Sequence, residues 1–234
     1  MEQRKTGVII VAGGSGRRAG GAQPKQFRIV GSLPVLGHAI NAFARALPGA
    51  PIVVVLAPEW RDLWRDLAAR FYIARHTCAA GGAERFHSVR NGLDTLPIDV
   101  SLVAVHDGAR PLASEELIRR CVACAAEHGS AVPTVAAVDS MRLLDDDGTS
   151  HPVDRSRLRS VQTPQVFDAA LLREAYMSDY RPEFTDDASV FERAGHSVTL
   201  CEGERSNLKI TVAEDLAIAG ALLDPNDSGR EQDL

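Results

Sequence analysis

Residues 7–25 read GVIIVAGGSGRRAGGAQPK. A short apolar run rich in β-branched residues passes directly into glycines, two adjacent arginines and a lysine that follows a proline. The apolar run predicts a buried strand, and the glycines predict a connection whose backbone can approach a ligand closely. The sequence therefore places local positive charge just after a strand, at the edge where open parallel sheets bind ligands.

Short apolar runs alternate with helical patterns along the rest of the chain. The runs predict five strands, at Val8–Ala12, Ile52–Leu56, Leu102–His106, Ala131–Val138 and Ser197–Cys201. A 3.6-residue apolar period predicts three helices, at Glu59–Phe71, Arg85–Leu96 and Ser114–His128. This alternation predicts an α/β fold, a Rossmann-like three-layer sandwich with a mostly parallel twisted sheet covered on both faces.

The composition limits the kinds of partner that we expect for the protein. The chain has 234 residues, of which 45% are hydrophobic, and a net charge of −5. That length supports one core, so we expect a single domain over residues 1–223 and a disordered tail over 224–234. The net charge does not favour a nucleic acid or a membrane surface as partner. Because no apolar run reaches the roughly 18 residues that a membrane span needs, we expect no membrane association and a cytoplasmic location.

Residues 139–165, DSMRLLDDDGTSHPVDRSRLRSVQTPQ, interrupt this alternation. An acidic turn, DDDGTS, separates MRLL from RLRSVQ, and this pattern predicts that the two segments form a hairpin arm over about 139–160. An arm with little core of its own needs a surface to pack on, so we expect a homodimer.

Cys121 and Cys124 are the only two cysteines that lie close together in the sequence. In SEELIRRCVACAAEH, Cys121 falls on one helical stripe with Leu117 and Ile118. We therefore expect Cys121 to pack in the core rather than to bind metal.

The glycine-rich connection does not fit two common phosphate-binding loops. A dinucleotide fingerprint has glycines at G-x-G-x-x-G, but Ala19 stands where the third is required. A Walker A loop has Ser or Thr after its lysine, and here Gln26 follows Lys25. Two interpretations of this connection are open. In one, its backbone N–H groups hold a nucleoside triphosphate, whose charge Arg17, Arg18 and Lys25 neutralise. In the other, it is a solvated basic loop.

Five further segments narrow these interpretations. They are GGAERFHSVRNGL (81–93), VHDGARPL (105–112), DRSRLRSVQTPQVF (154–167), TDDASVFERAG (185–195) and NLKIT (207–211). With the glycine-rich loop, over about residues 7–223, the chain resembles the family of 2-C-methyl-D-erythritol 4-phosphate cytidylyltransferases. The resemblance implies the nucleotidyltransferase fold. It also implies transfer of a cytidylyl group from CTP to 2-C-methyl-D-erythritol 4-phosphate with release of pyrophosphate, a step of non-mevalonate isoprenoid biosynthesis.

The resemblance also implies which residues act. Arg18, Lys25 and Lys209 are expected to be catalytic. Asp107 follows a predicted strand, where Mg²⁺ or another divalent cation would want a carboxylate, although Asp-Gly is also a common turn dipeptide. The residues expected to bind substrate are Ala12, Gly13, Gly14, Gly16, Arg17, Gly81, Gly82, Ala83, Ser88, Asp107, Arg110, Ser140, Arg155 and Thr185.

In the family that the chain resembles, the arm of one subunit covers the site of the other. The resemblance therefore implies that Ser140 and Arg155 act across a homodimer. The chain departs from the usual threonine and lysine of a DTxK pattern, because Ser140 and Arg142 stand there; the hydroxyl and the charge are both kept. We expect His106 to be packed at a strand end, and QTPQ at 162–165 to support the exit of the arm.

Three other functions are open at this point. A ribitol 5-phosphate cytidylyltransferase shares most of these motifs and differs mainly in the polyol pocket. A nicotinamide-dependent dehydrogenase would need the glycine spacing and the acidic ribose ligand that the chain lacks. A non-catalytic nucleotide sensor would not need several cations suited to a transition state.

Overall fold

The computed structural model describes residues 4–13 and 24–223. Its main sheet has the strand order β10-β7-β11-β6-β1-β4-β5, and β12 pairs with β7. The strands of this sheet are β1 (Thr6–Val11), β4 (Ile52–Leu56), β5 (Thr77–Ala80), β6 (Leu102–Asp107), β7 (Ser130–Ala136), β10 (Arg159–Val161), β11 (Gln165–Asp168) and β12 (Leu200–Glu202). Two small hairpins are formed by β2 (Ile29–Val30) with β3 (Leu33–Pro34) and by β8 (Met141–Leu144) with β9 (Ser150–Val153).

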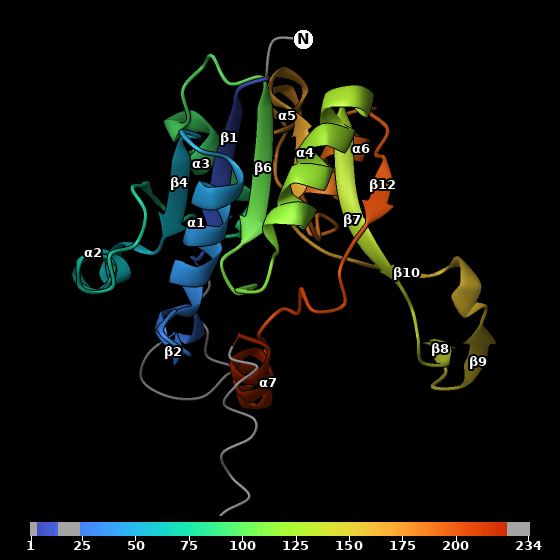
Figure 1. The fold of residues 1–234 in the computed structure, drawn as a ribbon. Coiled ribbons are helices and arrows are strands. Elements are labelled where there is room, and N and C mark those ends of the chain that lie inside the picture. The colour runs from blue at the N-terminus through green and yellow to red at the C-terminus, as the bar shows by residue number, and fades with distance from the viewer. Residues whose placement is uncertain (1–3, 14–23, 224–234) are drawn as a thin grey trace, which may run out of the picture.

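Helices cover both faces of the main sheet (Figure 1). One layer contains α1 (Val35–Ala46), α2 (Arg61–Arg70) and α4 (Glu115–His128). The opposite layer contains α3 (Arg85–Thr95), α5 (Ala169–Ala175) and α6 (Asp187–Arg193). The remaining helices are α7 (Ala213–Leu223) and the short 3₁₀ turns η2 (Lys25–Phe27), η3 (Pro58–Trp60) and η4 (Arg155–Arg157).

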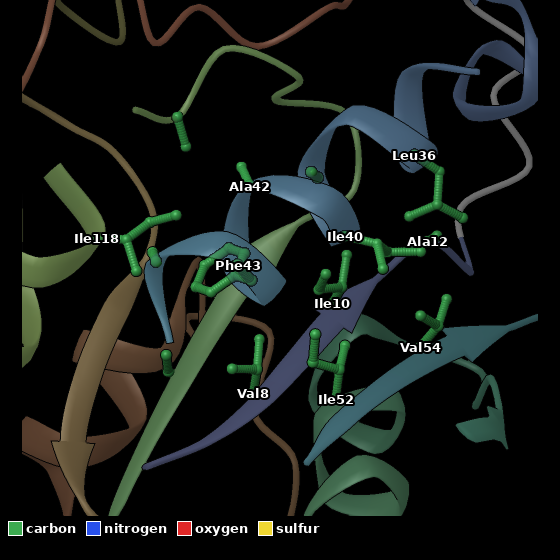
Figure 2. Close-up of a cluster of buried hydrophobic side chains, with 14 of the residues drawn as sticks. Val8, Ile10, Ala12, Leu36, Ile40, Ala42, Phe43, Ile52, Val54 and Ile118 are labelled. Carbon is green, nitrogen blue, oxygen red and sulfur yellow. The ribbon is translucent and has the colours of Figure 1, made fainter. Parts of the chain in front are cut away.

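The central strand β1 explains the layering. It pairs in parallel with β4 on one side and β6 on the other. Val8 and Ile10 point to the layer of α1 and α4, where Figure 2 shows them against Phe43 and Ile40. Ile9 points to the opposite layer. Because successive side chains of a strand alternate between faces, a strand buried on both sides is apolar throughout.

The predicted fold class is confirmed. The sheet is parallel through β6, β1, β4 and β5, and antiparallel only where β11 pairs with β6 and β7, and where β10 pairs with β7. The helix at α4 begins where the sequence predicts, because the Ser114 hydroxyl accepts a hydrogen bond from the Leu117 N–H at 2.9 Å. Cys121 is fully buried, as expected, with its Sγ 3.7 Å from the Sγ of Cys201.

The predicted pairing within the arm is wrong. MRLL, which is β8, pairs with Ser150–Val153 and not with RLRSVQ. Gly148 adopts a left-handed φ of 83°, which closes a tight turn right after the aspartates, so the next residues are the ones that pair. Part of RLRSVQ forms β10 and joins the main sheet beside β7. Figure 1 shows the β8–β9 hairpin projecting from the body of the protein.

The chain after β12 runs along the carboxyl edge of the sheet. The Ile210 N–H donates to the Ala109 carbonyl at 2.9 Å, and Arg110 donates to the Asn207 carbonyl at 2.8 Å. These bonds bring residues 207–210 beside the loop that follows β6. The predicted tail, 224–234, lies outside the described residues. Within residues 4–13 and 24–223, no helix has both the length and the apolar character to cross a membrane.

Candidate active site

A pocket of about 430 Å³ opens at the carboxyl ends of β1 and β6. Its walls come from five separate segments of the chain, which the parallel strands and the loop after β12 bring together. The residues that line it are Val11, Ala12, Gly13, Lys25, Gln26, Gly82, Ala83, Glu84, Arg85, Ser88, Asp107, Ala109 and Lys209. Eight of these are among the predicted site residues: Ala12, Gly13, Lys25, Gly82, Ala83, Ser88, Asp107 and Lys209.

The described ends of the glycine-rich connection form one wall. The Ala12 N–H donates to the Val55 carbonyl, and the buried Gln26 amide donates to the Ala12 carbonyl at 2.8 Å. The Lys25 ammonium donates to the carbonyl of Ile210 on the other side of the pocket. Lys25 therefore joins the start of the chain to its C-terminal segment. The predicted residues Gly14, Gly16, Arg17 and Arg18 lie outside the described residues.

The turn before α3 forms the second wall. The Gly81 N–H donates to the Leu56 carbonyl at 2.7 Å, which extends the edge of β4 into the turn. The Gly82 N–H donates to the Ser88 hydroxyl at 3.0 Å. A Cβ at position 82 would lie 2.3 Å from the Cβ of His87, so this turn closes only around glycine.

Asp107 ends β6 and is the buried carboxylate of the pocket, whereas Glu84, which also lines it, is exposed. Its Oδ2 lies 2.9 Å from the Lys209 ammonium and 3.6 Å from Arg110 Nε, while its Oδ1 lies 3.5 Å from Arg85 Nη2. Burial alone would raise the pKa of this carboxyl, but the charges of Arg85, Lys209 and Arg110 hold the pKa well below its usual range. Asp107 is therefore an anion at neutral pH.

The residues around Asp107 are fixed by a buried chain of hydrogen bonds. The Asp107 N–H donates to the Thr163 hydroxyl at 3.1 Å, and this hydroxyl contacts His106 Nδ1 at 3.0 Å. His106 Nε2 faces the Arg110 carbonyl at 3.1 Å, so Nε2 carries the proton and Nδ1 accepts. Burial lowers the pKa of His106 to about 4. His106 is packed, as predicted.

Gln162, Thr163 and Gln165 support the exit of the arm, as the sequence predicts for QTPQ. The Gln162 amide donates to the Glu204 carbonyl at 2.7 Å and accepts from the Glu204 N–H at 3.1 Å. The Gln165 amide donates to Asp186 and accepts from the Ala188 N–H. The Gln162 amide thus joins the exit of the arm to the segment after β12, and the Gln165 amide joins β11 to the start of α6.

Arg85 is part of the pocket wall and Asp187 is bonded to it, and neither residue was predicted from the sequence. Arg85 lines the pocket and forms two bonds with Asp187, at 2.8 and 2.7 Å. Burial lowers the pKa of Arg85, but the charge of Asp187 outweighs it and raises the pKa above its ordinary value. Both residues lie in segments that carry the resemblance, yet they are 102 positions apart and no local pattern pairs them.

Five predicted residues within the described chain are not among those that line the pocket. Gly81 directly precedes Gly82 of the lining, and Arg110 Nε lies 3.6 Å from Asp107; the other three are Thr185, Ser140 and Arg155. Thr185 is exposed in the loop before α6, two positions from Asp187. Ser140 and Arg155 are exposed on the arm, where Arg155 donates to the Val138 carbonyl. Of the residues that line the pocket in the described part of the chain, none comes from the arm. The role of these residues across a homodimer stays a prediction.

The pocket suits a divalent cation held largely by a substrate. Among residues 4–13 and 24–223, no cluster of three or more His, Cys, Asp or Glu side chains could hold a metal ion. Asp107 is the buried, ionised carboxylate that can contact such an ion, and the buried Nε of Arg110 beside it, which has no hydrogen-bond partner within the described structure, is a donor suited to a substrate phosphate oxygen. Mg²⁺ commonly binds through one or two carboxylates plus substrate phosphates, so the residues present fit this ion.

Glycine turns, cations and one buried carboxylate at the carboxyl edge of a mostly parallel sheet define an enzyme class that handles nucleotide phosphates. A family model described as 2-C-methyl-D-erythritol 4-phosphate cytidylyltransferase matches residues 6–225. The chain is 47% identical over 220 residues to the enzyme of that name from Bacteroides thetaiotaomicron, covering 94% of this chain and 100% of the relative. It is 44% identical over 225 residues to that of Porphyromonas gingivalis, covering 95% and 99%.

Solved structures agree with these relatives. The crystal structure of 4-diphosphocytidyl-2C-methyl-D-erythritol synthase from Anaerococcus prevotii superposes with a TM-score of 0.81 at 29% identity, covering 95% of this chain and all of that one. The cytidylyltransferase of Thermus thermophilus gives 0.71 at 32% identity, with 92% and 97% covered. The chain belongs to the 2-C-methyl-D-erythritol 4-phosphate cytidylyltransferase family. The predicted family and its CTP-dependent activity are confirmed.

Proposed function

We propose that the pocket beside Asp107 is where the cytidylyl group of CTP is transferred to 2-C-methyl-D-erythritol 4-phosphate. The observation that carries this proposal is the convergence of Lys25, Lys209 and Asp107 with the two glycine turns in one pocket of about 430 Å³. A phosphate oxygen of the second substrate attacks the α-phosphorus of CTP, and pyrophosphate leaves. The attacking phosphate is already an anion, so no strong general base is needed.

Catalysis then depends on positioning and on charge. Lys25 is assigned to the triphosphate, because it lies at the end of the glycine-rich connection and its ammonium reaches across the pocket. Arg18 and Arg17, beyond the described residues, are assigned to the same triphosphate. Lys209 is assigned to the phosphate of the second substrate, and we place Arg110 beside it because its guanidinium faces Asp107.

The turn from Gly81 to Ser88 is assigned to the cytosine. Ser88 already holds the Gly82 N–H, so the backbone carbonyls of this turn are fixed in direction. A fixed carbonyl that accepts from the cytosine amino group leaves a buried polar mismatch with uracil, which lacks that donor. We therefore assign the preference for CTP over UTP to Gly81, Gly82 and Ala83.

Asp107 is the residue that would hold a divalent cation. Such an ion, when bound, neutralises charge on the phosphate oxygens as the pentacoordinate state forms. Asp107 Oδ2 now contacts Lys209 at 2.9 Å, so this oxygen becomes free for a cation only when Lys209 turns toward a substrate phosphate. The negative charge of Asp107 thus holds Lys209 in place until the substrates arrive.

The arm is assigned to a homodimer in which Ser140 and Arg155 act at the site of the partner subunit. Met141, Leu143 and Leu144 are exposed on the arm of the single chain, and apolar side chains of this kind favour a covered surface. Thr185, two positions before Asp187, is assigned to the second substrate.

An assay of pyrophosphate release tests the proposed function. The protein is incubated with CTP, Mg²⁺ and either 2-C-methyl-D-erythritol 4-phosphate or ribitol 5-phosphate, with UTP replacing CTP as a control. We expect rapid release only with CTP and the methylerythritol phosphate. A higher kcat/KM with ribitol 5-phosphate, or equal rates with UTP, would overturn the assignment.

A further inference from the structure

A buried ion pair forms part of the pocket wall. Arg85 Nη1 and Nη2 donate to Asp187 Oδ1 and Oδ2 at 2.8 and 2.7 Å. The Tyr176 hydroxyl donates to the same Oδ1 at 2.6 Å, and Asp187 is fully buried. A carboxylate that accepts three such bonds cannot rotate, and its two parallel bonds fix the plane of the guanidinium.

Stability alone does not account for this pair. A buried ion pair is often no more stabilising than an apolar pair of similar size. An apolar pair is available in the same place, since Phe86 stacks on Tyr176 with the ring centroids 4.8 Å apart. Phe86 therefore already holds the start of α3 to Tyr176, the residue that follows α5, and Arg85 makes one contact that Phe86 does not make.

That contact is with Asp107. Arg85 Nη2, the nitrogen that bonds Asp187 Oδ2, also lies 3.5 Å from Asp107 Oδ1. The other oxygen of Asp107, Oδ2, faces Lys209 at 2.9 Å. The two oxygens of Asp107 thus have different nearest partners: Arg85 in the fixed wall for Oδ1, and Lys209 in the pocket for Oδ2, which also lies 3.6 Å from Arg110 Nε.

We propose that Arg85 is a positioning residue for Asp107 and that Asp187 holds Arg85 in place. Arg85 sets the rotation of the Asp107 carboxylate so that Oδ2 is presented to the pocket. Asp187 balances the charge of Arg85, so that the guanidinium orients the Asp107 carboxylate and does not itself bind the triphosphate. This inference rests on the proposed role of Asp107 as the residue that holds the divalent cation.

The test measures CTP binding at increasing Mn²⁺ concentration, without the second substrate, so that no turnover occurs. Loss of an outer partner of a metal ligand typically weakens metal binding by about 10- to 100-fold, so we expect Arg85→Lys and Asp187→Asn to raise the half-saturating Mn²⁺ concentration about tenfold. Tyr176→Phe is the matched control: it removes one bond to Asp187 but leaves both bonds to Arg85, and its Mn²⁺ dependence should equal that of the wild type.

Melting temperatures of all variants show which are folded. A folded Arg85→Lys or Asp187→Asn variant with the wild-type Mn²⁺ dependence would overturn the inference, as would an equal shift in Tyr176→Phe. The Asp107→Asn variant separates the two proposals. If it binds CTP with unchanged Mn²⁺ dependence, the proposed metal role itself fails; if it loses that dependence while both ion-pair variants keep it, only the positioning role fails.

Discussion

Lys209 and Asp107 form an ion pair of 2.9 Å across the pocket, although they are 102 positions apart in the chain. Asp107 is fixed at the end of β6, whereas half-exposed Lys209 sits on the segment that follows β12. The pair therefore ties the C-terminal segment to the sheet edge. The pair also keeps the Lys209 ammonium at the point where an anionic substrate must bind. The half-exposed lysine side chain can then turn toward that substrate.

Replacement of Lys25 by alanine should abolish most turnover without unfolding the protein. Loss of one well-placed transition-state donor costs about 3–4 kcal/mol, or roughly 10²–10³ in kcat. Pyrophosphate release and the melting temperature are measured together. Lys5→Ala, which removes the exposed ion pair with Asp99, is the control and should keep wild-type activity. A Lys25→Ala variant with near-normal kcat would contradict the proposed role.

Gly82→Ala should weaken CTP binding more than it weakens the fold. The new Cβ would meet the His87 Cβ at 2.3 Å, so the turn that is assigned to cytosine must shift, at a cost of about 1–3 kcal/mol. Calorimetric titration with CTP checks this. Gly220→Ala is the control, since its Cβ would meet only Val30 at 3.8 Å. Equal CTP affinities for Gly82→Ala and the wild type would count against the assignment.

His106 should make the protein less stable as the pH falls. Its pKa is about 4 in the folded protein against an ordinary value of 6.5, so the unfolded state takes up a proton first. The stabilisation that comes from the neutral state of buried His106 is fully present above pH 6.5 and is lost as the pH falls toward 4. It amounts to about 2 kcal/mol of unfolding free energy between pH 7 and pH 5.

Urea unfolding of the wild type and of His106→Gln at these two pH values measures this effect. Glutamine keeps one donor and one acceptor for Arg110 and Thr163 but does not titrate. We expect the loss of stability between pH 7 and pH 5 to be smaller in the variant by about 2 kcal/mol. Equal losses in the two proteins would show that His106 does not titrate in this range.

The strands around the site could be predicted from the sequence, but much of its wall could not. The β1, β4 and β6 runs are apolar on both faces, so their local pattern is strong. Helix α1 was missed because it begins after Pro34 without a side-chain cap and contains Gly37 and His38. A capping side chain, the usual local signal of a helix start, is absent there, although the apolar residues of the helix follow a helical period.

The errors in the site and arm have a different cause. Arg85 meets Asp187 only because α3 and α6 pack in the same layer, and this proximity exists only after folding. The arm pairing was wrong because both SHPV and RLRSVQ follow the acidic turn, and the tight turn at Gly148 selects the nearer segment. Pattern alone does not distinguish two segments that compete for one partner.

Mixing two inactive variants tests the predicted homodimer. Arg155→Ala should disable the arm and Lys25→Ala should disable the pocket, so each variant alone should be nearly inactive. If the arm acts on the partner subunit, a mixed dimer contains one intact site, so a refolded equimolar mixture should recover about a quarter of the wild-type activity, given random pairing. A mixture as inactive as its components would contradict an exchanged arm, and light scattering that gives a monomer would exclude the dimer.

The most direct measurement is a crystal structure of the protein with CTP and Mg²⁺. We expect the cytosine against Gly82 and Ser88, the triphosphate in contact with Lys25, and Lys209 turned away from Asp107. A triphosphate bound elsewhere, with the Lys209–Asp107 pair intact and the pocket at the end of β6 empty, would contradict this expectation.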